Sequence, residues 1–339
     1  MSSRRAILRR FTIPLVLALV VVTTMAAPAH AARPRASLTT VTAVMDWPTP
    51  WMGWTPWLVA DAKGYFAAEG IKFNLVIPAT VADPAKVLGT GHADFAFTTI
   101  LDVIEGRAQG APIIGVGAYA QYNNWGIIKW KDSKLTPKDL AGKSIGVYPD
   151  AWSKTQLTIF LKHVGIGINQ VKLVYTSSDT VPLLLTHKVD VITGVTNAEQ
   201  TEAEVTGKRA TTMYLANKYG VPNAYIWVLA ANTNFLHSHP AVARGWLRAA
   251  RRGLTYALAH PRDVVSIFMK RYPTALDRTY AIKSWANTVP LYTSDQTRAH
   301  GFFWQIPQVW QQTQQTLKTY GIIDQTMPVD QLYTNAYLH

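Results

Sequence analysis

The chain has 339 residues and a formal charge of +13, from 33 Lys and Arg against 20 Asp and Glu. It contains no Cys, which excludes a disulfide framework, a thiolate metal site, a Cys nucleophile and a lipid anchor on a lipobox Cys. With 48% hydrophobic residues, it has apolar content enough for two lobes of ordinary domain size.

The first 31 residues have the order of a secretory signal. MSSRRAILRR is basic, the run from Phe11 to Val22 is apolar, and Ala29-His30-Ala31 is an A-x-A-like cleavage site. Ser3 to Arg9 also resembles the twin-arginine motif, so either export route stays open. An uncleaved anchor is the alternative, although an apolar run of about a dozen residues is short against the roughly 20 that span a bilayer. We expect a mature protein from about Ala32, periplasmic or secreted.

The remaining charge is spread along the chain. Without the four Arg of the presequence, residues 32–339 carry about +9. Apart from Lys129 to Lys138 and a helical Arg series, the Lys and Arg are scattered, which argues against nucleic-acid binding. We expect a monomer that binds no nucleic acid.

A Trp-rich and Pro-rich stretch follows the first predicted strand. Residues 46–57 read DWPTPWMGWTPW and hold four of the 12 Trp. Their three Pro predict a shaped loop rather than a regular helix or central strand. Indoles on a loop at the carboxyl end of a strand favour a site for a flat or apolar molecule, and core packing is the alternative for any single Trp.

The chain up to residue 120 alternates between strands and helices. Strands are predicted at 38–45, 71–77, 91–97 and 112–120, and helices at 58–66, 85–88 and 100–107. This alternation predicts a parallel sheet with covering helices. Thr98 and Thr99 follow a strand directly, where ligands bind in open α/β sheets.

The rest of the chain predicts a second unit and then a helical end. Residues 121–140 lose helical periodicity and are interpreted as the first crossing between lobes. Strands are predicted at 144–147, 171–175 and 189–193, with helices at 153–163, 181–185 and 198–205. A return crossing with a strand at 225–230 precedes helices at 240–259, 263–270, 277–285 and 296–320. The predicted segments are a signal peptide at 1–31, a first lobe at 36–130, a second lobe at 131–222, and a return to the first lobe at 223–339.

Motifs of the common enzyme classes are missing. The histidines show no metal-ligand spacing, Gly115-x-Gly117 lacks the third Gly of a dinucleotide fingerprint, and no G-x-S-x-G occurs. Asp94 and Asp190 are interpreted as structural turn residues. We expect no metal, no cofactor and no catalytic residue.

Several stretches together resemble a known family. DW with Pro shortly after, KGYFAAEGIKFNL, GHADFAF, LTPKDLAGKSIGV, KVDVITGVTNAEQ and KYGVPNAYIWVLAANTNFL are similar to solute-binding proteins of ABC importers in the nitrate, sulfonate and taurine class. Within that class the chain looks most like the branch that binds pyrimidine precursors of thiamine. The resemblance covers almost all of residues 40–338.

The resemblance implies a fold, partners and a ligand site. The implied fold is α/β, two-lobed and of the type II periplasmic-binding-protein kind, with a cleft between lobes that close like a hinge. The implied partners are a small heteroaromatic ligand and an ABC permease. Asp46 and Trp47 match the branch's D-W, Asn197 and Glu199 its N-x-E stretch, and Tyr225 and Trp227 follow its Y-G-x-P. The candidate ligand-binding residues are Asp46, Trp47, Trp51, Trp54, Thr98, Thr99, Tyr119, Trp152, Asn197, Glu199, Tyr225 and Trp227.

Two alternatives accompany this hypothesis. A sulfonate-type or nitrate-type anion is one, because helix N-termini after Thr98 and Trp152 offer free N–H groups. A pyrimidine synthase on the same fold is the other. It is disfavoured because those synthases depend on a Cys-rich cluster, and we therefore expect the chain not to be an enzyme.

Overall fold

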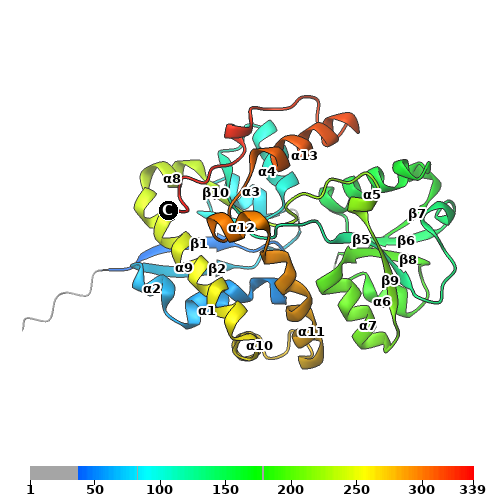
Figure 1. The fold of residues 1–339 in the computed structure, drawn as a ribbon, viewed down its shortest axis with the longest axis horizontal. Helices are drawn as coiled ribbons and strands as arrows, with labels where there is room; N and C mark the ends of the chain where they lie inside the picture. The colour runs from blue at the N-terminus through cyan, green and yellow to red at the C-terminus, as the bar shows by residue number, and fades with distance from the viewer. Residues whose placement is uncertain (1–36, 82, 178) are drawn as a thin grey trace, which may run out of the picture. The chain divides into compact units, whose positions relative to one another are not determined.

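The computed structural model describes residues 37–81, 83–177 and 179–339. The predicted signal peptide and its cleavage site lie outside the described residues. Two five-stranded sheets organise the described part, each with helices around it (Figure 1). The predicted two-lobed α/β fold is confirmed, and we call the part built on each sheet a lobe.

The first sheet has the strand order β2-β1-β3-β10-β4. β1 pairs in parallel with both β2 and β3, as the predicted β-α-β alternation requires. β10 then pairs antiparallel with β3 and β4. The strands are β1 (Thr39–Val44), β2 (Ile71–Val76), β3 (Phe95–Thr98), β4 (Ile113–Ala118) and β10 (Val228–Asn232).

The second sheet repeats this order as β7-β6-β8-β5-β9. β6 pairs in parallel with β7 and β8, and β5 pairs antiparallel with β8 and β9. The strands are β5 (Trp125–Trp130), β6 (Ser144–Val147), β7 (Lys172–Tyr175), β8 (Val191–Val195) and β9 (Thr211–Leu215).

Parallel sheets were predicted, but each sheet contains one antiparallel strand, β10 in the first and β5 in the second. Each antiparallel strand is the first one after a crossing, since β5 enters the second sheet and β10 returns to the first. The sequence reasoning missed β5 and β9 and treated 121–140 as a connection. All six residues of β5 are buried, so it has no alternation between polar and apolar residues to reveal a strand. The chain crosses before Trp125, so 125–130 belong to the second lobe rather than the first.

Helices cover the sheets close to most predicted positions. Those of the first two-thirds of the chain are α1 (Thr55–Ala62), α2 (Tyr65–Ala68), α3 (Asp83–Gly89), α4 (Ile100–Ala108), α5 (Ala151–His163), α6 (Val181–Leu185) and α7 (Thr201–Gly207). Those of the remainder are α8 (Thr233–Ser238), α9 (Pro240–Ala259), α10 (Pro261–Arg271), α11 (Arg278–Thr288), α12 (Asp295–His300) and α13 (Pro307–Thr319). Among the described residues, no helix is both long and apolar enough to cross a membrane.

Two predicted elements are corrected. The helix expected over 296–320 is two helices, because Gly301 and Phe303 adopt positive φ and Phe303 bridges to Ala118 of β4. The loop expected over 46–57 ends earlier, in a 3₁₀ turn at Met52–Trp54 followed by α1. Pro56 does not prevent this helix, since it occupies the first turn, where its missing N–H is not needed.

Asparagine side chains hold the two crossing segments together. Asn123 Nδ2 donates to Gln156 Oε1 (2.6 Å) and to the carbonyl of Pro222 (3.3 Å). Asn223 Oδ1 accepts from the backbone N–H of Asn123 (3.0 Å), and Asn217 Nδ2 donates to the carbonyl of Asn123 (3.1 Å). These amides satisfy the backbone of both crossings where no sheet ladder is available.

Helix α11 adds a connection that was not predicted. It packs against α10 and the 3₁₀ turn Met52–Trp54 in the first lobe, and against α7 and the π-helix Thr196–Gln200 in the second. Ser284 Oγ donates to the carbonyl of Asn197 (2.6 Å), and Asn197 Nδ2 donates to Thr288 Oγ1 (2.8 Å). In Figure 1 this helix lies between the parts built on the two sheets.

The tightest helix contact gives a stability prediction. At Gly253 in α9, an added Cβ would lie 2.2 Å from the carbonyl oxygen of Pro56 and 2.8 Å from the Cβ of Ala60. Gly253→Ala should therefore destabilise the fold by about 2 kcal/mol, measured by urea unfolding. In the same helix, Gly245→Ala is the control, because its Cβ would meet Glu69 side-chain atoms only at 3.3 Å. Equal unfolding midpoints for the two variants would contradict the close α1–α9 packing.

Candidate functional site

A pocket of about 970 Å³ is lined by residues of both lobes. Its walls include residues that directly follow β1 and β3 of the first sheet and β6 and β8 of the second. This is the carboxyl edge of the parallel strands, where open α/β sheets bind ligands. The volume is at the upper end of the roughly 300–1,000 Å³ typical of small-molecule sites.

Asp46 organises the loop after β1. Its Oδ1 accepts from the indole N–H of Trp54 (2.8 Å) and of Trp51 (3.1 Å). Burial raises the pKa of Asp46 to about 7, although the two indole hydrogen bonds act to lower it. One carboxyl group thus fixes two Trp rings, and of these Trp51 lines the pocket.

Aromatic rings from both lobes form the pocket walls. The ring centroids of Trp51 and Trp227 are 5.0 Å apart, and Trp51 also stacks on Phe97. Trp47 packs edge-on against Tyr148 of the second lobe, with ring centroids 4.7 Å apart. Trp47, Trp51, Tyr148 and Trp227 all line the cavity, so a flat ligand would find aromatic surface on both sides.

Glu199 is buried, not on an exposed helix face. It belongs to the π-helix Thr196–Gln200, a rare geometry that is frequent at functional sites. Oε1 accepts from the Tyr148 hydroxyl (3.0 Å) and Oε2 from the backbone N–H of Val195 (2.8 Å). Gly194 leaves the space for it, since a Cβ there would lie 2.5 Å from the Cβ of Glu199. Burial raises the pKa of Glu199.

Glu202, one helical turn after Glu199, forms an acidic pair with Asp179. Burial, together with the nearby Asp179, which shares a side-chain hydrogen bond with it, raises the pKa of Glu202 to about 8. Tyr280 from α11 lies beside this pair and also lines the pocket. Glu199, Glu202 and Asp179 thus form a carboxyl group cluster on the second-lobe side.

Carboxylates already occupy the two helix N-termini that were considered for an anion. At α4, Asp102 Oδ2 accepts from the Thr98 hydroxyl (2.6 Å) and from the backbone and hydroxyl of Thr99 (3.0 and 2.7 Å). At α5, Asp150 Oδ1 accepts from the N–H of Ser153 (2.7 Å). An oxyanion bound at either helix N-terminus would lie beside the charge of one of these carboxylates.

The structure brings eight of the 12 predicted residues to the pocket and leaves four outside its lining. The eight are Asp46, Trp47, Trp51, Thr98, Thr99, Trp152, Glu199 and Trp227. Those outside are held by internal hydrogen bonds: Trp54 donates to Asp46, Tyr119 to the carbonyl of Gly53, and Asn197 to Thr288, while Tyr225 accepts from the N–H of Ile306. A sequence motif places a residue near a strand end, but it does not decide which side of the backbone the side chain takes.

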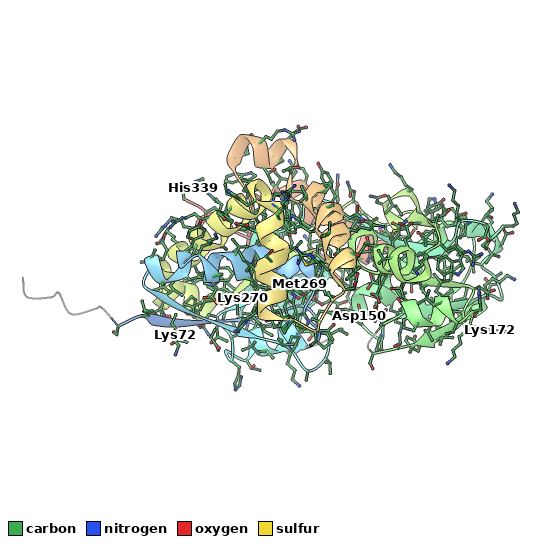
Figure 2. The ribbon with its side chains drawn as sticks, turned by 90° about the horizontal axis from the view of Figure 1, so that it is seen from below. Lys72, Asp150, Lys172, Met269, Lys270 and His339 are labelled. Atoms are coloured by element: carbon green, nitrogen blue, oxygen red, sulfur yellow. The ribbon has the colours of Figure 1, made fainter. Side chains whose placement is uncertain are left out.

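Sequence reasoning missed several polar residues of the pocket. Asp150 and Asp102 occupy helix-capping positions. Capping alone explains an Asp at such a position in the sequence, so nothing there indicated that these residues also line a cavity. Glu202 had a usable signal, because it follows Glu199 by one helical turn. Tyr280 had none, since α11 reaches the pocket only through tertiary packing. Figure 2 shows Asp150 where the second lobe, drawn in green, meets the rest of the molecule.

Comparison with known proteins decides the family. The model of the family described as NMT1/THI5 like matches residues 51–264. The chain belongs to the NMT1/THI5-like family. The resemblance drawn from the sequence motifs is thereby confirmed.

Curated relatives of this NMT1/THI5-like chain have different names. A putative thiamine biosynthesis protein of Haemophilus influenzae is 26% identical over 69% of this chain and 74% of its own length. A 4-amino-5-hydroxymethyl-2-methylpyrimidine phosphate synthase of Legionella pneumophila is 24% identical over 88% and 92%. The riboflavin-binding protein RibY of Chloroflexus aurantiacus is 25% identical over 92% and 89%.

Solved structures share the fold of this family member at low sequence identity. The periplasmic aliphatic sulphonate binding protein SsuA of Escherichia coli superposes with a TM-score of 0.67 at 15% identity, covering 88% of this chain and 92% of that one. The ligand binding component of an ABC-type import system from Staphylococcus aureus gives 0.65 at 16% identity, covering 88% and 97%.

The expectation that the chain is not an enzyme is wrong. Relatives from Legionella pneumophila, Aspergillus parasiticus and Saccharomyces cerevisiae, at 24–25% identity, are named as pyrimidine phosphate synthases. The absence of Cys removes one nucleophile and one class of metal ligand, and nothing more. Carboxyl groups with raised pKa values, of which this pocket has several, are themselves suited to proton transfer.

The same carboxyl groups predict how stability depends on pH. Burial raises the pKa of Asp46 and Glu105 to about 7, of Asp150 to about 6 and of Glu202 to about 8. The folded state therefore holds protons that the unfolded chain releases near pH 4, so stability should rise as pH falls from about 8 to about 6. Thermal unfolding of the unliganded protein should show a midpoint a few degrees higher at the lower pH.

The control is the uncharged isostere Glu202→Gln. In this variant the thermal midpoint should increase less as the pH is lowered from about 8 to about 6. A midpoint that falls over the same range, or an unchanged slope in Glu202→Gln, would contradict the assignment of these raised pKa values.

Proposed function

We propose that this chain is the extracytoplasmic substrate-binding component of an ABC importer, and that it captures a small heteroaromatic ligand of the thiamine-precursor pyrimidine kind. The observation that carries the proposal is that Trp47, Trp51 and Trp227 line one pocket together with Glu199, whose carboxyl group accepts from Tyr148 in the same wall. Stacking on indoles supplies affinity, and a buried acceptor selects a ring with an amino or N–H donor.

The relatives and structural neighbours support this proposal in two ways. The names of two relatives refer to thiamine biosynthesis and riboflavin binding, and both thiamine and riboflavin contain nitrogen heterocycles. The neighbours of the same fold include an import-system binding component and a periplasmic binding protein. An ABC permease is accordingly the proposed partner and the periplasm or cell exterior the proposed location.

The anion alternative is weaker in this pocket. The helix N-termini that would hold a sulfonate or nitrate are capped by Asp102 and Asp150. The ionised carboxyl groups in the wall repel an anion, and Lys86 is the cation among the described lining residues. We therefore rank a sulfonate, taurine or nitrate below a heterocycle with donors.

Calorimetry tests the ligand class. A panel of aminopyrimidines, riboflavin, alkylsulfonates, taurine and nitrate should give binding for one or more heterocycles and none for the anions. Glu199→Gln should weaken heterocycle binding about tenfold or more, because a charged acceptor is replaced by a neutral amide. Trp47→Ala should weaken it as well, whereas Trp304→Ala, which changes a ring outside the pocket lining, should not. Binding of sulfonates or nitrate alone, unchanged in Glu199→Gln, would refute the heterocycle assignment.

Hinge closure is part of the proposal. The flexing segments would be residues 119–124 and 216–227, together with both ends of α11, since α11 is bonded to the second lobe through Asn197. Ligand should lower the radius of gyration of the mature protein in small-angle scattering. Scattering curves that are identical with and without a ligand shown to bind would argue against closure.

A further inference from the structure

The charge of the pocket is opposite to that of the chain. Lys and Arg outnumber Asp and Glu by 33 to 20 overall. Among the described residues, by contrast, the pocket lining contains eight carboxyl groups, no Arg and one Lys, the exposed Lys86. A concave surface with charges of one sign focuses the field into the cavity. Such an imbalance in an otherwise basic protein points to the ligand rather than to solubility.

Within the described part of the chain, no Lys, Arg or His forms an ion pair with these carboxyl groups. The ion pairs among the described residues join Lys63 to Asp263, Arg209 to Asp132, Arg248 to Glu69 and Arg298 to Asp295, and none of these residues lines the pocket. Glu202 instead shares a hydrogen bond with a second carboxyl group, that of Asp179.

One carboxyl oxygen in the wall accepts no hydrogen bond from the described residues. Asp150 Oδ1 accepts from Ser153 N–H, but Oδ2 is shielded from solvent and has no hydrogen-bond partner among the described residues. A buried acceptor left unmatched costs roughly 1–3 kcal/mol, more if charged. Asp150 belongs to the pocket wall, so a ligand in the cavity is placed to supply a donor or a positive charge to this oxygen.

A metal ion does not match this arrangement. The described residues contain no group of three or more His, Cys, Asp or Glu side chains placed to hold one. Instead, the carboxyl groups are interspersed with the rings of Trp47, Tyr148 and Trp227. Rings and carboxylates around one cavity are the combination that binds organic cations, through the ring faces and the opposite charge together.

We infer that the ligand is an organic cation: a heteroaromatic ring that carries positive charge on an alkylated or protonated nitrogen. The inference rests on the proposed heterocycle-binding function and adds the charge of the ligand. The rings would stack on the aromatic part, while the carboxyl groups of Asp150 at the start of α5, of Glu199 on the π-helix and of Glu202 on α7 would face the charge.

Three probes that share one ring system test the charge. N-methylisoquinolinium, isoquinoline and isoquinoline-5-sulfonate present the same bicycle as a cation, a neutral molecule at pH 8 and an anion. Calorimetry at pH 8 on the full mature chain should show the cation binding at least tenfold more tightly than the neutral ring, with no binding of the sulfonate.

Paired variants separate charge recognition from loss of the pocket. Asp150→Asn and Glu202→Gln should each weaken the cation about tenfold and leave the affinity of neutral isoquinoline within about twofold, because only the charged ring loses a charge-assisted contact. Asp324→Asn removes the same charge from an exposed site away from the pocket and should change neither affinity. Circular dichroism and the thermal midpoint of each variant confirm that it is folded.

The outcomes distinguish the two proposals. Equal or tighter binding of neutral isoquinoline, or tight binding of the sulfonate, would overturn the cation inference and leave heterocycle binding intact. Variants that weaken the cation and the neutral ring equally would also overturn it. No binding of any probe, together with no binding of the heterocycle panel, would refute the proposed function itself.

Discussion

A carboxylate that leaves water at the end of a strand must be given hydrogen-bond donors, and much of this structure follows from that requirement. Asp46 obtains them from two indoles, and in doing so it sets the path of the loop from Trp47 to Trp54. Glu199 obtains them from Tyr148 and from the backbone of Val195, with Gly194 leaving the room. Asp102 and Asp150 obtain them from the first turns of α4 and α5. The pocket is the place where these four arrangements meet.

The same requirement connects recognition with the fold. An acidic side chain that caps a helix both stabilises that helix and carries negative charge to the cavity. Asp150 does both, one oxygen facing the α5 backbone and the other having no donor. Raised pKa values are then the expected state of such groups when no ligand is present. We therefore propose a positively charged or donor-rich ligand rather than an anion, although the structural neighbours of this fold include a sulphonate-binding protein.

The two lobes have the same strand order. They are connected by side-chain hydrogen bonds and by helix α11 as well as by the two crossings of the chain. The amides of Asn123, Asn217 and Asn223 tie the crossings side by side. Helix α11 then reaches the second lobe and bonds to the same π-helix that presents Glu199. A ligand that engages Glu199 would therefore act on an element in contact with α11, which joins ligand binding to the relation between the lobes.

Sequence by itself determined the alternation of strands and helices, the two-lobed class, the family and the Trp-rich loop, because these depend on local periodicity, on Pro and Gly positions and on motifs that are continuous in the chain. It also indicated Asp46, Trp47, Trp51 and Glu199 as pocket residues. It did not separate them from Trp54, Tyr119, Asn197 and Tyr225, which are equally close to strand ends but turn into the interior. Nor did it show β5, which is buried on both faces and so lacks alternation, or the break at Gly301–Phe303. The charge of the pocket was decided only by the tertiary structure, since Asp102, Asp150 and Glu202 are far apart in the chain and converge only when the strand ends enclose one cavity.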